Sequence, residues 1–338
     1  MNKTNILKYG NWIYKLENGN QKVETLKSVP TSVYKYYPFN NNSRNALQKG
    51  YLYCSHPNQL NDSIDSSPLI WDFSKMEEDR YNAFYRDYGI DEINTPNYIE
   101  DKKNNFEEIK FHFYNLSTNQ MGVISLSETP LNILMWAHYS NEQGLMIEFD
   151  WEIIRDNLKE LNSDLKNYVF FPVQYVESVE KVDFFSENYG SPDVPLLYSW
   201  GVKRDDWSYE NEWRLIVYLQ NLGIPSSGNS SYSHLGTRER KIYYPKEAIK
   251  TIVLGKYFFD RMKPLTPVGK TESFKYQIEC EDFDFIKYLA DNFNDKIYLS
   301  GEIEKEGKLK RSTERIELQL LDENILEIER KYEGFHQR

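Results

Sequence analysis

One segment, residues 207–218, restricts the fold most, because apolar and charged side chains alternate along it over the length of a strand. Alternation in a strand places on one face Tyr209, Trp213, Leu215 and Val217. It places on the other face Glu210, Glu212, Arg214, Ile216 and Tyr218. Same-face neighbours lie about 6.6–6.8 Å apart, so two carboxylates and a guanidinium form a row. The sequence therefore predicts a strand with a core face and a charged face that needs water, partners or a ligand.

The charged row allows two interpretations. A carboxylate held rigidly on a strand stabilises a developing cation or polarises a hydroxyl, which makes Glu212 and Glu210 candidate catalytic residues, assisted by Arg214. The same row is typical of an ion-pair ladder on a half-exposed strand. The two glutamates share a face and do not flank a bond, which argues against glycoside hydrolysis.

A second group of polar and aromatic residues lies between residues 33 and 62. Two tyrosine-rich strands flank a short helix that ends at a glycine, and a Ser-His-Pro turn leads to an Asn-Asp pair. Tyrosine rings offer flat surfaces to a nicotinamide or a nucleobase, and Lys35 and Ser55 have the chemistry to bind phosphate or ribose. We therefore expect ligand contacts from Lys35, Tyr36, Ser55 and Asn61. The alternative is a pair of edge strands followed by an ordinary turn.

A third group follows Thr129 and Pro130, which are typical of a helix start and predict a helix over residues 131–139. Helical spacing places Met135, His138 and Tyr139 on one face. His138 is a candidate general base or ligand-orienting residue, and Tyr139 is a candidate ligand contact. His138 has no partners at metal-ligand spacing, so we expect no metal; a structural histidine packed between aromatic rings is the alternative.

Strand and helix patterns alternate irregularly along the chain, which predicts an α+β fold with mixed or antiparallel sheets and flanking helices. Strands are expected at residues 33–37, 51–55, 122–126, 145–149, 173–176, 212–219, 249–255 and 316–321. Helices are expected at residues 43–49, 71–88, 98–116, 131–139 and 282–293, and a flexible surface loop at 221–240. We expect an N-terminal extension at 1–30, a main domain at 31–300, and a strand-and-helix appendage to that domain at 301–338.

Composition narrows the class of protein. The 338 residues include 52 Asp and Glu against 41 Lys and Arg, and this net charge of −11 disfavours binding of nucleic acid mainly through its phosphates. The 2 cysteines lie far apart and fit neither a disulfide framework nor a zinc site, which favours a reducing cytoplasm. No secretory signal is recognisable and the apolar runs are too short to cross a bilayer, so no membrane partner is expected. Aromatic residues make up 15% of the chain, and tyrosine lines a wet cleft as readily as a dry core.

The order of these motifs resembles a bacterial family known as domain of unknown function 2971 (DUF2971). The matching residues are Tyr34-Lys35-Tyr36, Cys54 to Asp62 with Asp65, Ser125-Leu126-Ser127, Leu134 to Tyr139, Gly144, Glu148-Phe149, Lys203, Trp207, Tyr209-Glu210, Glu212-Trp213-Arg214 and Ile252 to Gly255. They run in order from about residue 30 to 300. The combination of Trp-x-x-Glu-x-Glu-x-Arg with Met-Trp-x-His-Tyr makes the resemblance specific.

More distantly, the chain resembles proteins with the ADP-ribosyltransferase fold, above all the DNA-modifying toxin and RNA phosphotransferase branches. Gly50-Tyr51-Leu52 corresponds to the turn after the first helix, and Glu212 opens a late apolar strand. The resemblance implies NAD as the substrate. In such enzymes a glutamate at the position of Glu212 holds the nicotinamide ribose and stabilises the oxocarbenium as nicotinamide leaves. Glu210 corresponds to the first glutamate of the pair that some members carry.

The chain also departs from that fold family. Where those proteins place His or Arg on the first strand, this chain has Lys35 between two tyrosines, and lysine lacks the forked hydrogen bonding of arginine. Their Ser-Thr-Ser strand is reduced to Ser55, which His56 follows.

These observations lead to three hypotheses about function. The first is an ADP-ribosyltransferase-like enzyme, in a toxin or phage-defence setting, that takes NAD as a small nucleotide ligand and uses protein, nucleic acid or water as acceptor. The second is a non-catalytic domain that binds a nucleotide or a partner. The third is a metal-dependent nuclease or phosphoesterase built on Asp62, Asp65, Glu210 and Glu212. The positions of these carboxylates relative to Tyr36 and Ser55 distinguish the three.

Overall fold

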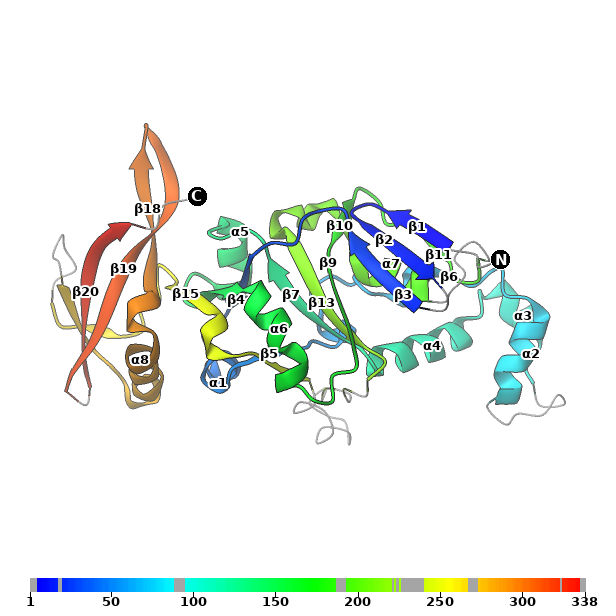
Figure 1. Ribbon diagram of the computed structural model, residues 1–338, viewed down its shortest axis with the longest axis horizontal. Coiled ribbons are helices and arrows are strands. Elements are labelled where there is room, and N and C mark those ends of the chain that lie inside the picture. Colours follow the sequence, from blue (N-terminus) through cyan, green and yellow to red (C-terminus); the bar gives the residue numbers. More distant parts are fainter. Residues whose placement is uncertain are drawn as a thin grey trace.

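A long mixed sheet forms the centre of the molecule (Figure 1). The computed structural model describes residues 5–17, 20–87, 95–186, 193–220, 222, 225, 240–266, 273–322 and 324–334. Within them, the sheet has 11 strands. In spatial order these are β16 (Lys263–Pro264), β17 (Ser273–Gln277), β20 (Ile325–Gly334), β19 (Lys308–Asp322), β18 (Ile297–Lys305), β15 (Ile249–Leu254), β8 (Leu145–Asp150), β4 (Ser32–Tyr37), β7 (Gly122–Ser127), β13 (Glu212–Tyr218) and β9 (Asn167–Pro172). Strands β15 and β18 are parallel and the other neighbours are antiparallel, so the expected mixed sheet is confirmed.

Four smaller sheets surround the large one. The first contains β1 (Asn5–Tyr9), β2 (Trp12–Glu17) and β3 (Asn20–Thr25). The other three are the pairs β10 (Gln174–Val176) with β12 (Val202–Arg204), β11 (Val182–Asp183) with β6 (Trp71–Asp72), and β14 (Lys241–Tyr243) with β5 (Tyr51–Tyr53). The three-stranded sheet packs on the rest of the molecule through Trp12 and Tyr14, both 1% exposed, which lie in one cluster with Phe171 and Trp200.

The helices complete an α+β fold. They are α1 (Asn41–Lys49), α2 (Glu78–Asp87), α3 (Tyr98–Lys103), α4 (Glu107–Asn119), α5 (Ile133–Met135), α6 (Trp151–Leu161), α7 (Asp193–Gly201) and α8 (Cys280–Phe293). Apolar residues of α1, α6 and α8 join the main core with one face of the central strands. Helices α2 and α4 form a separate aromatic cluster at the end of the molecule where the N-terminal sheet lies (Figure 1). Among the described residues, no helix is long and apolar enough to span a membrane.

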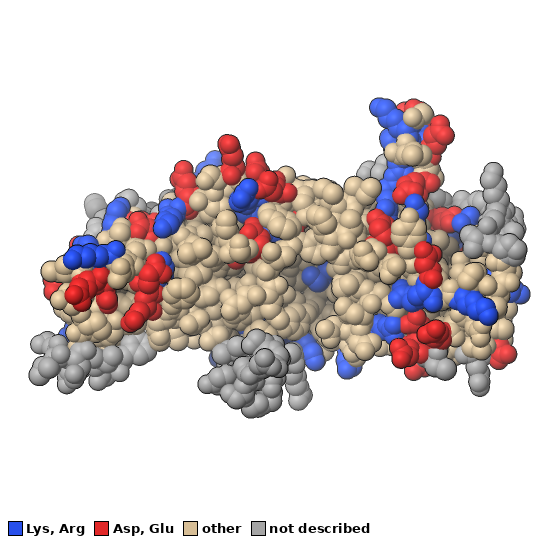
Figure 2. All heavy atoms as spheres, turned by 180° about the vertical axis from the view of Figure 1, so that it is seen from behind, with Lys and Arg blue, Asp and Glu red and all other residues tan. Residues whose placement is uncertain are grey.

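The C-terminal strands extend the same sheet at the opposite end from the N-terminal sheet (Figure 1). The hairpin of β18 and β19 projects beyond the sheet, and its tip exposes Leu309 (80%). On the rear face, many charged side chains lie towards the two ends of the molecule, and a hollow in the middle of this face contains a Lys or Arg group (Figure 2).

Two of the expected helices are divided in the structure. Residues 71–88 begin with strand β6, and helix α2 starts only at Glu78, because Trp71 is buried beside β11. Residues 98–116 form two helices, since Asn105 and Phe106 have positive φ angles of 54° and 51° that end α3. The expected loop at 221–240 lies outside the described residues, apart from positions 222, 225 and 240.

The helix expected at 131–139 is also different. Leu131 has a φ of 59°, so Asn132 rather than Thr129 is the N-cap, and its side chain accepts from the amides of Leu134 and Met135. Helix α5 then continues as a single π-helical turn, Trp136–Ser140. Such turns are uncommon and often occur at functional sites, because they re-aim the side chains that follow.

Candidate functional site

The large sheet is split between β4 and β7. Strand β4 pairs with β8 over its whole length, but the register with β7 contains one pair, Tyr34 with Ser127. Further along β7, an isolated bridge joins Val123 to Ser55. Between these two points, the Lys35 side chain spans the gap and donates a hydrogen bond to the carbonyl oxygen of Ser125 at 2.9 Å. The sheet therefore contains an opening with a polar bridge across it.

A cavity of about 190 Å³ occupies this opening. Consecutive residues of β4 and of β7 line this cavity. In a continuous sheet, consecutive side chains point to opposite faces and so could not line the same cavity. The lining residues are Tyr34, Lys35, Tyr36, Ser55, Gln59, Leu60, Asn61, Asp65, Ser125, Leu126, Ser127, Met135, Tyr139, Lys203, Glu210 and Glu212. Aromatic, hydroxyl and charged groups thus meet in one small space.

The two glutamates reach the cavity from different local structures. The expected strand over residues 207–218 starts only at Glu212, because Asp205–Glu210 forms a 3₁₀ turn and Asn211 adopts a φ of 44°. The Ser127 hydroxyl donates to the carbonyl oxygen of Glu210 at 2.7 Å and fixes this turn against β7. Glu210 and Glu212 are 3% and 4% exposed. The ion pairs of the alternative interpretation are present, but they are buried rather than on a half-exposed strand.

Arg214 is the fully buried centre of the charge cluster, at 0% exposed. Its guanidinium binds both oxygens of Asp65, at 2.7 and 2.5 Å, and both oxygens of Glu212, at 2.8 and 3.1 Å. The remaining contact is with the carbonyl oxygen of Trp200 at 2.7 Å. Arg214 does not line the cavity; it orients the carboxylates that do.

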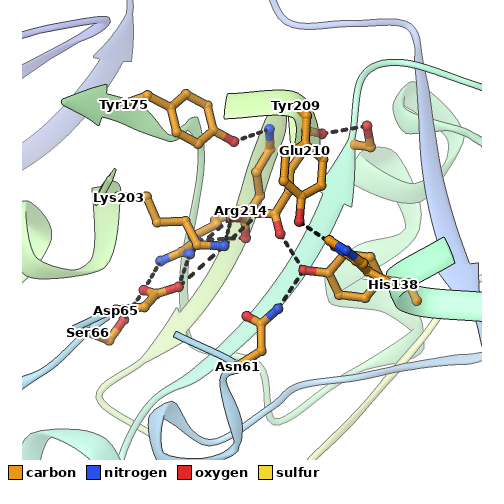
Figure 3. Close-up of polar contacts among 12 residues, drawn as sticks. Asn61, Asp65, Ser66, His138, Tyr175, Lys203, Tyr209, Glu210 and Arg214 are labelled. Carbon is orange, nitrogen blue, oxygen red and sulfur yellow. Dashed lines mark hydrogen bonds and ion pairs between the residues drawn. The ribbon is translucent and has the colours of Figure 1, made fainter. Parts of the chain in front are cut away.

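Lys203 is the second cation of the cluster (Figure 3). Its ammonium donates to Glu210 at 2.6 Å and to Glu212 at 3.2 Å, and it lies 3.7 Å from Asp65. The side chain also lies over the ring of Trp207 at 5.0 Å. Three carboxylates thus surround two cations, which leaves the cluster with a net charge of −1 when all five groups are ionised.

Glu210 is held on its other side by a short chain of hydrogen bonds (Figure 3). The Tyr139 hydroxyl donates to Oε1 of Glu210, and the Asn61 amide donates to the Tyr139 oxygen at 2.8 Å. The π-helical turn carries Tyr139 to this position. Asn61 is exposed, so this chain connects the buried carboxyl group to solvent.

The turn that carries Tyr139 is held from the C-terminal hairpin. Arg311 on β19 donates to Glu142 through two guanidinium nitrogens, one of them at 2.9 Å, and its Nε donates to Ser300 at 2.8 Å. Its guanidinium lies 5.1 Å from the centre of the Trp136 ring. Trp136 in turn packs edge-on against Tyr36, with centroids 5.4 Å apart. The hairpin therefore contacts the first residue of the π-helical turn, Trp136, and Glu142, which follows the turn.

The environment drives the pKa values of the two glutamates in opposite directions. Burial and the neighbouring Glu212 charge raise the pKa of Glu210 above its ordinary value. Burial alone would also raise the pKa of Glu212, but Arg214 and Lys203 hold it well below its usual range. Two adjacent carboxyl groups with pKa values driven apart are the usual arrangement of a proton carrier beside a permanent anion.

Lys35 adds a third titratable group. Burial lowers the pKa of its ammonium to about 8, against the opposing effect of Glu212. Near neutral pH the amine therefore exchanges its proton readily. Burial and the neighbouring Glu210 raise the pKa of Tyr139, so its hydroxyl remains a donor.

The structure brings most of the predicted site residues together. Seven of them line the cavity, namely Lys35, Tyr36, Ser55, Asn61, Tyr139, Glu210 and Glu212. Arg214 lies behind them. His138 is exposed and is not in the lining; its Nδ1 lies 2.8 Å from the Tyr209 hydroxyl.

Sequence reasoning missed the roles of Lys203 and Tyr175. The Tyr175 hydroxyl accepts a hydrogen bond from the backbone N–H of Glu212 at 2.9 Å, where β13 begins. Lys203 follows apolar residues of α7, and a lysine in such a segment needs carboxylate partners. The sequence therefore indicated that Lys203 needs carboxylate partners, but it did not indicate which carboxylates these are.

The carboxylates of the metal-dependent hypothesis already have hydrogen-bond or ion-pair partners within the protein. Asp62 accepts from the backbone N–H of Ile64 at 2.9 Å, while Asp65 and Glu212 accept from Arg214. Among the described residues, no group of three or more His, Cys, Asp or Glu side chains has the arrangement to hold a metal ion.

Comparison with known proteins identifies one relationship. A model of the family described as "Protein of unknown function (DUF2971)" matches residues 135–215, which include Tyr139, Lys203, Glu210, Glu212 and Arg214. A comparison with curated proteins gives no match, and a comparison with solved structures gives none either. This match supports the resemblance to the DUF2971 family, and it covers the segment that carries most of the charge cluster.

Proposed function

We propose that the cavity between β4 and β7 is the active site of an ADP-ribosyltransferase-like enzyme with NAD as its substrate. The observation that carries this proposal is the convergence of Glu210 and Glu212 with Tyr36 and Ser55 on one cavity. These residues come from three separate parts of the chain. A purely structural ion-pair cluster has no need of an aromatic and hydroxyl wall opposite its carboxylates.

Charge and size support NAD as the ligand. The cluster beside the cavity carries a net charge of −1, which favours the positively charged nicotinamide ring. Tyr34 and Tyr36 supply flat ring surfaces. A volume of about 190 Å³ lies below the roughly 300–1,000 Å³ typical of whole-ligand pockets, so the cavity receives the nicotinamide-ribose end and the rest of the dinucleotide lies outside it.

The proposed reaction breaks the bond between the ribose C1′ and the nicotinamide nitrogen. Nicotinamide leaves with the bonding electron pair, and the positive charge passes to the ribose. Glu212, kept ionised by Arg214 and Lys203, stabilises that charge through space. An acceptor oxygen or nitrogen then bonds to C1′ and gives its proton to Glu210, whose pKa is raised above its ordinary value by burial and by Glu212.

The charge of the protein and its proposed substrate also suggest an acceptor and a cellular location. The net charge of −11 favours a protein side chain or water over nucleic acid as acceptor. We place the enzyme in the cytoplasm, where NAD is present, and in a toxin or phage-defence role. The buried free thiol of Cys54 suits a reducing compartment.

The direct test is incubation of the purified protein with NAD, followed by measurement of free nicotinamide and of mass added to protein. Glu212→Gln and Glu210→Gln are each expected to lower steady-state nicotinamide release by about 100-fold or more, as loss of a charge-stabilising group or of a general base commonly does. Glu148→Gln is the matched control, because Glu148 is also buried but hydrogen-bonds to Ser32 and Thr251 outside the cavity. Its activity is expected to match the wild type.

Two results would overturn the proposal. One is full activity in Glu212→Gln. The other is the absence of nicotinamide release over hours with protein, nucleic acid and water all offered as acceptors. Calorimetric binding of NAD without any release would instead support the non-catalytic nucleotide-binding hypothesis.

A further inference from the structure

A second cavity lies at the far end of β13 from the charge cluster. Its volume is about 350 Å³, larger than that of the cavity between β4 and β7 and within the range of small-molecule sites. Strand β13 begins beside the first cavity at Glu212 and ends at Tyr218, which lines the second. The two cavities share no lining residue.

Aromatic rings from four elements dominate the walls of this second cavity. The rings belong to Tyr14 of β2, Tyr168 and Phe170 of β9, Trp200 of α7 and Tyr218 of β13. Aliphatic side chains complete the apolar part, namely Val23, Val169, Leu196, Leu197 and Leu219. Aromatic walls favour a flat ring that packs in offset or edge-on contacts.

The polar groups of the lining fix the charge of the ligand. They are Ser117 and Gln120 at the end of α4 and Lys22, together with the hydroxyl-bearing residues Tyr14, Tyr168 and Tyr218. Lys22 forms an ion pair with Glu24 at 2.9 Å and its side chain is 71% exposed, so it offers little attraction for an anion. Among the described residues, no carboxylate lines the cavity, so none of them offers a partner to a cation there. The fitting ligand is an uncharged aromatic molecule with a group that hydrogen-bonds to a hydroxyl or an amide.

The N-terminal sheet closes this cavity. Val23 and Lys22 of β3 and Tyr14 of β2 form one wall, and the remaining walls belong to the large sheet, α4 and α7. The segment expected from the sequence to be only an extension thus supplies part of a binding surface.

Trp200 connects the second cavity to the charge cluster. Its ring lines the cavity, and its carbonyl oxygen accepts the 2.7 Å hydrogen bond from Arg214. Lys203, three residues later, donates to Glu210 and Glu212. A ligand that fixes the Trp200 ring therefore acts on the same short segment that orients both cations of the cluster.

We propose that this second cavity binds an uncharged one- or two-ring aromatic molecule, and that Trp200 transmits its presence to the Arg214 and Lys203 cluster. The proposal does not depend on the reaction proposed above. In this proposal, the N-terminal sheet and the end of β13 form a regulatory site. Because coupling between two binding sites is reciprocal, a ligand in either cavity changes the affinity of the other cavity for its own ligand.

The test uses 2-naphthol as the probe and the full chain as the protein. Titration calorimetry is expected to show saturable binding of one probe per chain, and cyclohexanol, which has no aromatic ring, is expected to bind at least 10-fold more weakly. Val23→Trp, which fills the cavity, is expected to weaken probe binding at least 10-fold. Val176→Trp is the matched control, because Val176 is also a half-buried strand residue but lines a different cavity.

Circular dichroism and the melting temperature establish that each variant is folded. Gln120→Leu is a second test, because Gln120 lines the cavity but is exposed, and this variant is expected to bind the probe more weakly. Unchanged affinity in a folded Val23→Trp variant, or equal weakening in Val176→Trp, overturns the site. Failure of the probe to saturate also overturns it. Hydrogen exchange tests the connection: the probe is expected to slow exchange at residues 200–203, and unchanged exchange there overturns the role of Trp200.

Discussion

The Tyr139 hydroxyl donates a hydrogen bond to the Glu210 carboxylate, and this contact joins a π-helical turn to the carboxyl group with the raised pKa. Tyr139→Phe removes a donor that favours the ionised form of Glu210. We therefore expect the variant to raise the pKa of Glu210 further above its ordinary value. Carbon-13 NMR titration of glutamate-labelled protein measures it, with Glu210→Gln to assign the signal.

The same change alters the dependence of stability on pH. A carboxyl group whose pKa is raised on folding binds more protons in the folded state, so its contribution falls as pH rises above its ordinary value. This fall is expected to extend to higher pH in Tyr139→Phe. Tyr198→Phe is the control, because that hydroxyl donates to the carbonyl oxygen of Glu180 outside the cavity. An unchanged Glu210 titration in Tyr139→Phe would contradict the assignment.

Arg214→Met is expected to destabilise the fold severely. The change leaves Asp65 and Glu212 buried without their main cation, and such losses cost about 3–5 kcal/mol. Arg214→Lys keeps the charge but not the forked geometry, so an intermediate loss is expected. The double variant Asp65→Asn with Arg214→Met is expected to lose less than the sum of the single losses, because the two residues form one unit. Urea unfolding measures these differences, and a loss below about 1 kcal/mol for Arg214→Met would refute the central role of this residue.

Lys35 is expected to make the free energy of unfolding increase with pH. Its pKa is lowered to about 8 from an ordinary 10.5, so between these values the unfolded chain binds more protons than the folded one. Stability attributable to Lys35 therefore rises as pH rises through that window. Relative to Lys35→Met, the wild type is expected to gain on the order of 1–2 kcal/mol between pH 7 and 10, after allowance for solvent screening of a half-buried group. Urea unfolding of both proteins at the two pH values measures the gain.

Lys49→Met provides the comparison for Lys35, because Lys49 is exposed at the end of α1. No pH-dependent difference from the wild type is expected for it. A constant difference between Lys35→Met and the wild type across the whole pH range would show that the ammonium is not desolvated in the gap.

Arg311→Gln is expected to loosen the turn at residues 136–142 without unfolding the hairpin. The variant loses the paired hydrogen bonds to Glu142 and the contact with the Trp136 ring, at a cost of about 1–3 kcal/mol. Hydrogen exchange is expected to speed up at the turn. Lys310→Gln, next to it and exposed, is expected to leave exchange unchanged. Equal exchange at the turn in both variants would rule out the proposed support from the hairpin.

Local sequence patterns predicted the central strands well. Strands β4, β7, β8 and β15 lie within one or two residues of their expected bounds, because buried strands are short runs of apolar and β-branched residues. Helix α6 was missed although its signals were present. Asp150 caps its N-terminus, and Trp151, Ile154 and Leu158 are buried at helical spacing.

The site was harder to predict than the strands, for a physical reason. Residue types indicated which side chains carry chemistry, and seven of those candidates meet in the cavity. The pairing of Arg214 with Asp65 joins positions 149 apart in the chain, and nothing local in the sequence encodes it. The positive φ of Asn211 was equally impossible to predict from the local sequence pattern. Because of this one residue, Glu210 lies in a turn and not in the strand.

The split between β4 and β7 divides the large sheet into two halves along a single line. In the strand register, only Tyr34 and Ser127 join them, and Lys35 adds one side-chain hydrogen bond. The cavity walls lie on either side of this line. A molecule held in the cavity would therefore contact both parts of the sheet at once and bridge them where their backbone pairing is interrupted.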